Sequence, residues 1–176
     1  MGPAPASNRK LKWKTLLGLE GSPIEYSWKW NTKSSEPDVR LTMEPIGQYT
    51  ATAKDPLNQS AAREMLHHIG QVCESVDPTW ADHFFSTMFD HDVSKYNQEA
   101  AAGATFSTSC LIAAEFLPEG LSMKSYFVPR RLGQSGGLTP LAQWEEAFAK
   151  LHPDSAARAA VHQFLKAHPD KVMHPV

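Results

Sequence analysis

The chain has 176 residues, of which 41% are hydrophobic, enough for a single core. Its net charge of −2 gives no basic field for nucleic acid or anionic membrane, and no apolar run approaches the ~20 residues of a transmembrane helix. The start lacks the charged and apolar regions of a signal peptide, and two cysteines make neither a disulfide framework nor a metal spacing. We therefore expect one cytoplasmic domain over residues 1–176, with no nucleic-acid or membrane partner.

The first half of the chain predicts a hairpin followed by two helices. Residues 1–12 are rich in proline and polar groups, so we expect an extended segment. Strands are expected at about 23–31 and 38–45, because they flank a polar loop with turn residues. Helices are expected over 56–76 and 78–89, since each begins with an Asp-Pro pair and then carries apolar side chains at helical spacing.

The second half repeats this order. We expect a loose segment around Gly103, followed by strands at about 105–116 and 122–128 that are joined by a Pro-Glu-Gly turn. Two further helices are predicted over 140–151 and 155–167, the first beginning with Thr-Pro and the second ending before His-Pro.

The order of elements predicts an α+β fold. Antiparallel hairpins that alternate with helix pairs indicate one antiparallel sheet with helices on one outer face, and we expect all four helices to pack on its apolar side. Residues 170–176 are expected to form a tail. Four strands are too few to close a barrel around a ligand, so at least one sheet edge should be unpaired, and association through exposed edges is expected.

Ionisable and apolar side chains alternate along the first and last predicted strands. Because successive side chains point to opposite faces of a strand, spacing alone assigns each residue to a face. We place the chemistry on the polar face, away from the helices. In the first strand Glu25, Ser27 and Lys29 lie opposite Ile24, Tyr26, Trp28 and Trp30, and in the last Lys124 and Tyr126 lie opposite Met123, Ser125 and Phe127.

Four ordered segments carry a family resemblance. Together, and over about residues 2–151, they resemble the fungal indole prenyltransferases of the dimethylallyltryptophan synthase family. The resemblance implies a barrel of ten antiparallel strands ringed by helices and built from αββα units, of which this chain matches a part. The segments are Trp13-Lys14-x-Leu16-Leu17 with Gly21-Ser22-Pro23-Ile24-Glu25, then Val39-Arg40-Leu41-Thr42-x-Glu44-Pro45, then Phe89-Asp90-His91-Asp92, then Lys124-x-Tyr126-Phe127-x-Pro129.

The resemblance implies a reaction in which dimethylallyl diphosphate ionises and an indole captures the allyl cation. Arg40 and Lys124 match positions that bind the diphosphate with side-chain charge, without a metal and without a cofactor. The aspartate-rich Asp-Asp-x-x-Asp run of magnesium-dependent prenyltransferases is absent from the sequence. Tyr126 matches a tyrosine that shields the cation with its π face.

The same resemblance assigns the acceptor side of the site. Glu25 matches the carboxylate that holds the indole N–H, and Leu16 and Leu17 match a loop that lines the indole pocket. Leu111 stands where several members that use free tryptophan carry a lysine. Val128 stands where relatives carry a second shielding tyrosine. These departures favour a tryptophan-containing cyclic dipeptide or another larger indole over free tryptophan.

Without the resemblance, these residues have ordinary interpretations. A charged side chain on a strand is usually a solvated surface group, and a surface ion pair contributes little stability. Metal binding by the histidines is not expected, because His67-His68 and Asp90-His91-Asp92 lack a third convergent ligand. The ordinary readings are exposed charges for Glu25 and Lys29, a solvated lysine for Lys124, a half-buried aromatic for Tyr126, and a surface pair of Arg40 with Glu44.

Three functional hypotheses remain open at this point. The first is transfer of a dimethylallyl group to an indole in fungal secondary metabolism. The second is a truncated, catalytically silent remnant of such an enzyme, since much of the implied barrel is missing. The third is a barrel completed by two chains through their sheet edges.

Overall fold

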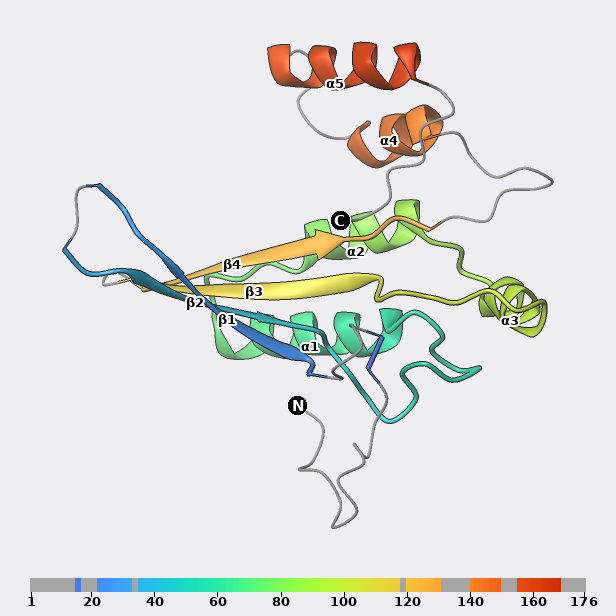
Figure 1. The fold of residues 1–176 in the computed structure, drawn as a ribbon, viewed down its shortest axis with the longest axis horizontal. Coiled ribbons are helices and arrows are strands. Elements are labelled where there is room, and N and C mark those ends of the chain that lie inside the picture. Colours follow the sequence, from blue (N-terminus) through green and yellow to red (C-terminus); the bar gives the residue numbers. More distant parts are fainter. Residues whose placement is uncertain are drawn as a thin grey trace.

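The computed structural model describes residues 15–16, 22–32, 35–117, 120–130, 140–149 and 155–168. The predicted extended segment at 1–12 and the tail at 170–176 lie outside these ranges. Figure 1 shows the elements in sequence colours: β1 (Ile24–Lys29), β2 (Asp38–Met43), α1 (Gln59–Val72), α2 (Thr79–Met88), α3 (Val93–Ala101), β3 (Cys110–Leu117), β4 (Gly120–Phe127), α4 (Pro140–Phe148) and α5 (Ala156–Ala167).

The four strands form one antiparallel sheet in the order β1-β2-β3-β4. Two hairpins, β1–β2 and β3–β4, meet at the β2–β3 pair, and the segment between these two strands carries α1, α2 and α3. The α+β fold and the antiparallel sheet are therefore as predicted. Within the part of the chain that the structure describes, the edge strands β1 and β4 each pair with a strand on one side only.

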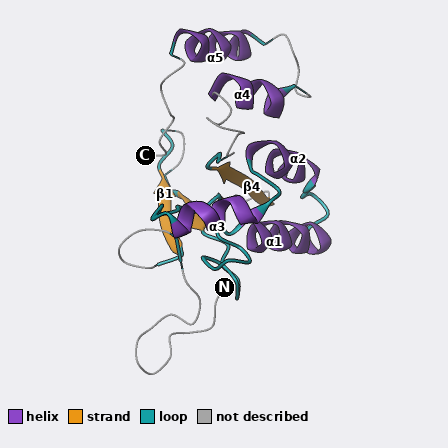
Figure 2. Cartoon of the chain, turned by 90° about the vertical axis from the view of Figure 1, so that its right-hand side faces the viewer, coloured by secondary structure: helices purple, strands orange, loops and turns teal. Residues whose placement is uncertain are grey.

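Helices α1 and α2 cover one side of the sheet, α1 against β3 and α2 against β4 (Figure 2). The core lies between these helices and β3. It is formed by buried side chains from these three elements, from α3 and from the loops beside them. They are Leu57, Ala62, Leu66, Phe85, Phe89, Tyr96, Cys110 and Ile112.

The prediction that all four expected helices pack on the sheet is wrong for the last two. Helix α4 packs on α2, and α5 packs on α4, so they form a further layer beyond α2 (Figure 1). Ring contacts explain this arrangement: Phe84 of α2 lies 5.5 Å from Phe127 of β4 and 5.6 Å from Phe148 of α4. Because α2 stands between them, the apolar side of α4 meets a helix and not the strands.

The apolar face of the sheet is left uncovered near the hairpin loops. Trp28, Val39, Phe116 and Leu121 pair across all four strands, and each is exposed. The helices contact β3 and β4 and leave this end of β1 and β2 without a helical cover among the described elements. The expectation that helices would bury the aromatic face of the first strand is therefore wrong here.

A helix occupies the segment that we expected to be loose. In α3 the Asp92 side chain accepts a hydrogen bond from the Ser94 N–H at 2.9 Å and so caps the first turn. Tyr96 is its one buried residue; its hydroxyl donates to the Arg130 carbonyl and accepts from the Asp90 N–H at 2.8 Å. A single buried side chain gives no apolar stripe, which is why periodicity did not reveal this helix.

An aspartate accepts backbone hydrogen bonds at the start of both α1 and α2, and the boundary of α1 is shifted from the predicted one. Asp77 accepts from the Thr79 N–H at 2.9 Å, so α2 begins close to the predicted position. Helix α1 begins at Gln59 and not at residue 56, because the Asp55 carboxylate reaches forward to the N–H groups of Ser60 at 3.0 Å and Ala61 at 3.2 Å. Burial raises the pKa of this carboxyl, and those N–H bonds partly offset the shift.

Asn58 ties the end of the first hairpin to the start of the second. Its side-chain amide donates to the carbonyls of Pro45 at 3.0 Å and Cys110 at 3.2 Å. Its carbonyl oxygen accepts from the N–H of Ser109 at 2.8 Å and from the hydroxyl of that serine at 2.7 Å. The Ser109 N–H also donates to Leu57 at 3.0 Å, so β3 begins at Cys110 and not at residue 105.

Replacing Asn58 with alanine should destabilise the fold by roughly 3 kcal/mol, because it removes four hydrogen bonds, among them the donor to the Pro45 carbonyl and one of the two donors to the Cys110 carbonyl. Alanine also tolerates the φ of 56° less well than asparagine does. Urea unfolding measures the change. The control is Asn97→Ala, which loses one exposed hydrogen bond to Ala53 and should cost less than about 1 kcal/mol. Equal losses in the two variants would contradict the role given to Asn58.

Candidate functional site

The strand register places the predicted site residues on one face of the sheet. Glu25 and Lys124 lie in one cross-strand row, with Thr42 and Ala113 between them. Arg40 lies in the next row, and Tyr126 lies two residues from Lys124 on the same strand, so the same alternation puts all four on the face away from α1 and α2.

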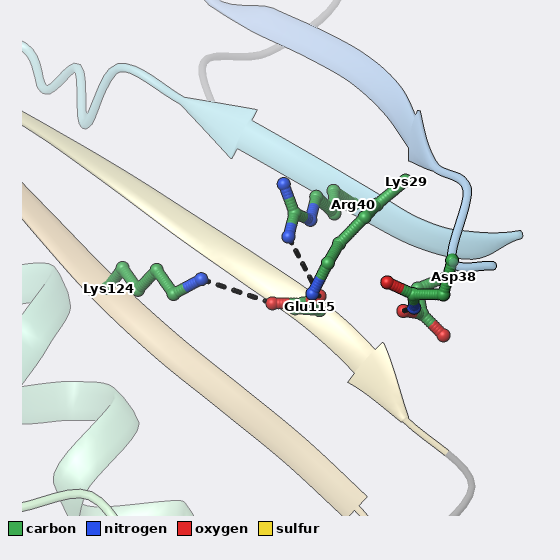
Figure 3. Close-up of polar contacts among 6 residues, drawn as sticks. Lys29, Asp38, Arg40, Glu115 and Lys124 are labelled. Atoms are coloured by element: carbon green, nitrogen blue, oxygen red, sulfur yellow. Dashed lines mark hydrogen bonds and ion pairs between the residues drawn. The ribbon is translucent and has the colours of Figure 1, made fainter. Parts of the chain in front are cut away.

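Glu115 of β3 is the centre of this polar face (Figure 3). One of its oxygens, Oε1, lies 3.0 Å from Nη2 of Arg40 and 3.3 Å from Nζ of Lys29, and Oε2 lies 3.1 Å from Nζ of Lys124. The carboxylate is 8% exposed, whereas the three cations keep 32% to 48% of their side chains exposed. Hydrogen bonds from Arg40 and then Lys124 lower the pKa of Glu115 to about 2.

Strand alternation puts Glu115 on the same face as Ala113, but the sequence alone did not reveal that it binds three cations. Arg40 and Glu115 are 75 residues apart, so only the β2–β3 register brings them together. The ordinary readings of two of its partners are therefore wrong. Arg40 pairs with Glu115 and not with Glu44, and Lys124 is held by a carboxylate on the neighbouring strand.

Glu44 fastens part of the predicted acceptor loop to the end of β2. This carboxylate is buried, and it accepts the Leu16 N–H at 2.9 Å and the Thr15 hydroxyl. The backbone of Leu16 therefore lies beside the end of β2. Leu17, the other residue assigned to that loop, lies outside the described residues.

The polar face contains a hollow of about 120 Å³ beside Glu115. Its floor is made of small side chains. Thr42 and Ala113 lie between Glu25 and Lys124 in the cross-strand row. Glu25 is exposed and makes no hydrogen bond or ion pair with any residue that the structure describes. The hollow is lined by Ser27, Arg40, Thr42, Ala113, Ala114, Glu115, Lys124 and Tyr126.

Several other ionisable groups form pairs in or beside the helices. His67 of α1 bonds Asp82 of α2 at 2.8 Å, and Lys95 bonds Asp90 at 2.7 Å. Over the ranges that the structure describes, no three metal-ligating side chains gather in one place. No helix in those ranges combines the length and the apolar character needed to span a lipid bilayer.

Solved structures share the fold of this chain. The fold matches AnaPT from Neosartorya fischeri with a TM-score of 0.71 at 23% identity, covering 94% of this chain and 42% of AnaPT. It matches the NotF prenyltransferase with a TM-score of 0.56 at 19% identity, covering 89% of this chain and 37% of NotF.

The sequence assigns the family. Residues 1–176 match the model of the tryptophan dimethylallyltransferase family, and the chain belongs to that family. It is 58% identical over 176 residues to prenyltransferase anuH of Penicillium roqueforti, covering 99% of this chain and 39% of that relative. It is 44% identical over 178 residues to xanthone prenyltransferase B of Emericella nidulans, covering 99% of this chain and 38% of that protein. The chain thus spans about two fifths of the length of these relatives.

Acid should weaken the fold through Glu115. Since its folded pKa of about 2 lies below the ordinary 4.5, its stabilising effect is present above pH 4.5 and is lost as the pH falls toward 2. We expect urea unfolding to show a smaller loss of stability between pH 6 and pH 3 in Glu115→Gln than in the wild type. Glu145→Gln, which removes a half-exposed carboxylate beside His162, controls for the loss of a surface charge. Parallel stability–pH curves for wild type and Glu115→Gln would contradict this assignment.

Proposed function

We propose that this protein serves the transfer of a dimethylallyl group from dimethylallyl diphosphate to an aromatic acceptor. The observation that carries the proposal is the group of cations on one sheet face of a chain in the tryptophan dimethylallyltransferase family. Because the chain spans about two fifths of its relatives, the proposal concerns the share of the site that these four strands supply.

Arg40 and Lys124 are proposed to bind the diphosphate. Ionisation of the allylic carbon–oxygen bond leaves a pyrophosphate with several negative charges, and positive side chains stabilise that charge as it develops. Arg40 offers a fork of N–H donors and Lys124 a compact ammonium, and both side chains are partly exposed toward the hollow. The charge of the leaving pyrophosphate is thus neutralised by side chains, and neither a metal nor a cofactor is proposed.

Tyr126 is proposed to shield the allyl cation. It is 50% exposed and lines the hollow beside Lys124, so its ring lies next to the proposed diphosphate position. An aromatic face attracts a cation. It is also a poorer nucleophile than water, so it stabilises the cation without capturing it. Water must be kept from the cation for the acceptor to capture it.

Glu25 is proposed to hold the acceptor. An exposed carboxylate without a partner among the described residues is free to accept a hydrogen bond from an acceptor N–H or O–H. Its backbone lies three strand spacings from that of Lys124, about 14 Å, with small side chains between. That distance leaves room for an aromatic ring and a dimethylallyl group, and Leu16 and Leu17 are proposed to line the pocket of the ring.

Two acceptor classes have support. An indole, as in tryptophan or a tryptophan-containing cyclic dipeptide, follows from the family description, and a solved NotF complex of similar fold at 19% identity contains brevianamide F and DMSPP. An oxygenated aromatic is the second candidate, because two relatives at 44% and 42% identity are named xanthone prenyltransferases. Glu25 suits both, since it accepts from either an N–H or an O–H.

Replacing Glu25 with glutamine should lower prenyl transfer at least about tenfold, because the neutral amide is a weaker acceptor for the polarised N–H or O–H. The assay incubates the chain with dimethylallyl diphosphate and a panel of indoles and xanthones, with products detected by mass spectrometry. Glu64→Gln, an exposed carboxylate of α1, is the matched control and should retain full activity.

The outcomes separate the alternatives. A Glu25→Gln variant as active as wild type would remove the acceptor role from this carboxylate. No turnover with any acceptor, together with intact pyrophosphate binding, would favour a catalytically silent remnant. Turnover that rises steeply with protein concentration, with a dimer in sedimentation, would favour a barrel completed by two chains.

A further inference from the structure

We propose that Lys29 is a third cation of the diphosphate site and that Glu115 is the built-in counter-ion that diphosphate displaces. This inference rests on the proposed function, because it takes a diphosphate as the ligand. It adds two residues to the pair, Arg40 and Lys124, to which the sequence assigned that ligand.

The first argument is convergence. Lys29 and Arg40 reach the same oxygen of Glu115, at 3.3 Å and 3.0 Å, and Lys124 reaches the other oxygen at 3.1 Å. They come from β1, β2 and β4, on both sides of β3 (Figure 3). Their nitrogen atoms are thus focused on a small anion, and lysine and arginine groups that bind a carboxylate also suit a phosphate.

The second argument is the exposure of the partners. Glu115 is 8% exposed and lies beneath its three cations, which keep 43%, 32% and 48% of their side chains exposed. Arg40 uses one guanidinium nitrogen, Nη2, in its contact with Glu115. An anion arriving from solvent would therefore meet the cations before it met the carboxylate, and it would find further N–H donors on them.

The third argument is charge. Three cations and one carboxylate give the cluster a net charge of +2, more than a structural ion pair needs. The Lys95–Asp90 pair has nearly the same exposure, 42% and 8%. Asp38 is the cross-strand neighbour of Lys29 and keeps its negative charge, but its carboxylate accepts from Asn31 at 2.7 Å and forms no ion pair with the cations of the cluster. The excess of positive charge attracts a multiply charged anion more strongly than a singly charged one.

The fourth argument is competition. A carboxylate whose pKa is held near 2 stays ionised at neutral pH, so it does not leave the cations by taking up a proton. A singly charged anion would bind the three cations hardly more tightly than Glu115 does. A diphosphate would place several negative charges beside the same three cations and would therefore bind them more tightly. Glu115 therefore favours diphosphate over weaker anions and keeps the cations grouped while the site is empty.

Calorimetric titration of the 176-residue chain with inorganic pyrophosphate, at neutral pH and low ionic strength, tests the inference. We expect Lys29→Met to weaken binding about fivefold, equivalent to ~1 kcal/mol, and Lys29→Arg to restore it to within about twofold. Lys95→Met is the matched control and should bind as wild type does. Glu115→Gln should bind pyrophosphate about threefold more tightly, because the competing charge is gone, and should bind sulfate more tightly as well.

Each outcome decides a separate point. If Lys29→Met binds like Lys95→Met while Arg40→Met and Lys124→Met lose binding, the third-cation inference fails and the proposed function stands. If Glu115→Gln binds more weakly, with thermal unfolding that matches wild type, the counter-ion role fails. If the wild type does not bind pyrophosphate at all, the proposed function fails together with this inference. The Lys29 variants decide the first point even if Glu115→Gln does not fold.

Discussion

The contact between Arg40 and Glu115 across the β2–β3 pair is the interaction on which the polar face depends. It joins the two hairpins at the centre of the sheet, and it places a nearly buried carboxylate where cations from both hairpins can reach it. Without this carboxylate, Lys29, Arg40 and Lys124 would be three like charges on one face of the sheet, which repel one another. With it, they form one cluster whose charge still exceeds that of its anion.

The two faces of the sheet have different roles. On the helical side, α1, α2 and β3 bury the aromatic and aliphatic groups that hold the strands in register. On the polar side, small residues such as Thr42 and Ala113 leave space between the ionisable groups. Asn58 connects the two, because its hydrogen bonds fix where β3 begins and therefore which β3 residues face the hollow.

Strand alternation predicted the faces of Glu25, Lys124 and Tyr126 because a period of two is a property of the extended backbone. It did not predict the partner of Arg40, since that depends on pairing between distant segments. Helical periodicity likewise predicted that α4 buries one side, but not that this side meets Phe84 of α2. The short α3 was not predicted, because Tyr96 is its single buried side chain and gives no apolar periodicity. The sequence thus predicted local geometry, but it did not predict contacts between residues far apart in the chain.

The long connection between β2 and β3 also bears on the order of folding. Each hairpin joins strands that are close in sequence, whereas the β2–β3 pair must close the whole segment from Met43 to Cys110, and contacts of high sequence separation form more slowly. Lys29 and Arg40 belong to one hairpin, and Glu115 and Lys124 to the other. The cation cluster is therefore a late product of folding, complete only after the two hairpins have docked. Until that step, the two positive side chains of the first hairpin lack the carboxylate that neutralises part of their charge.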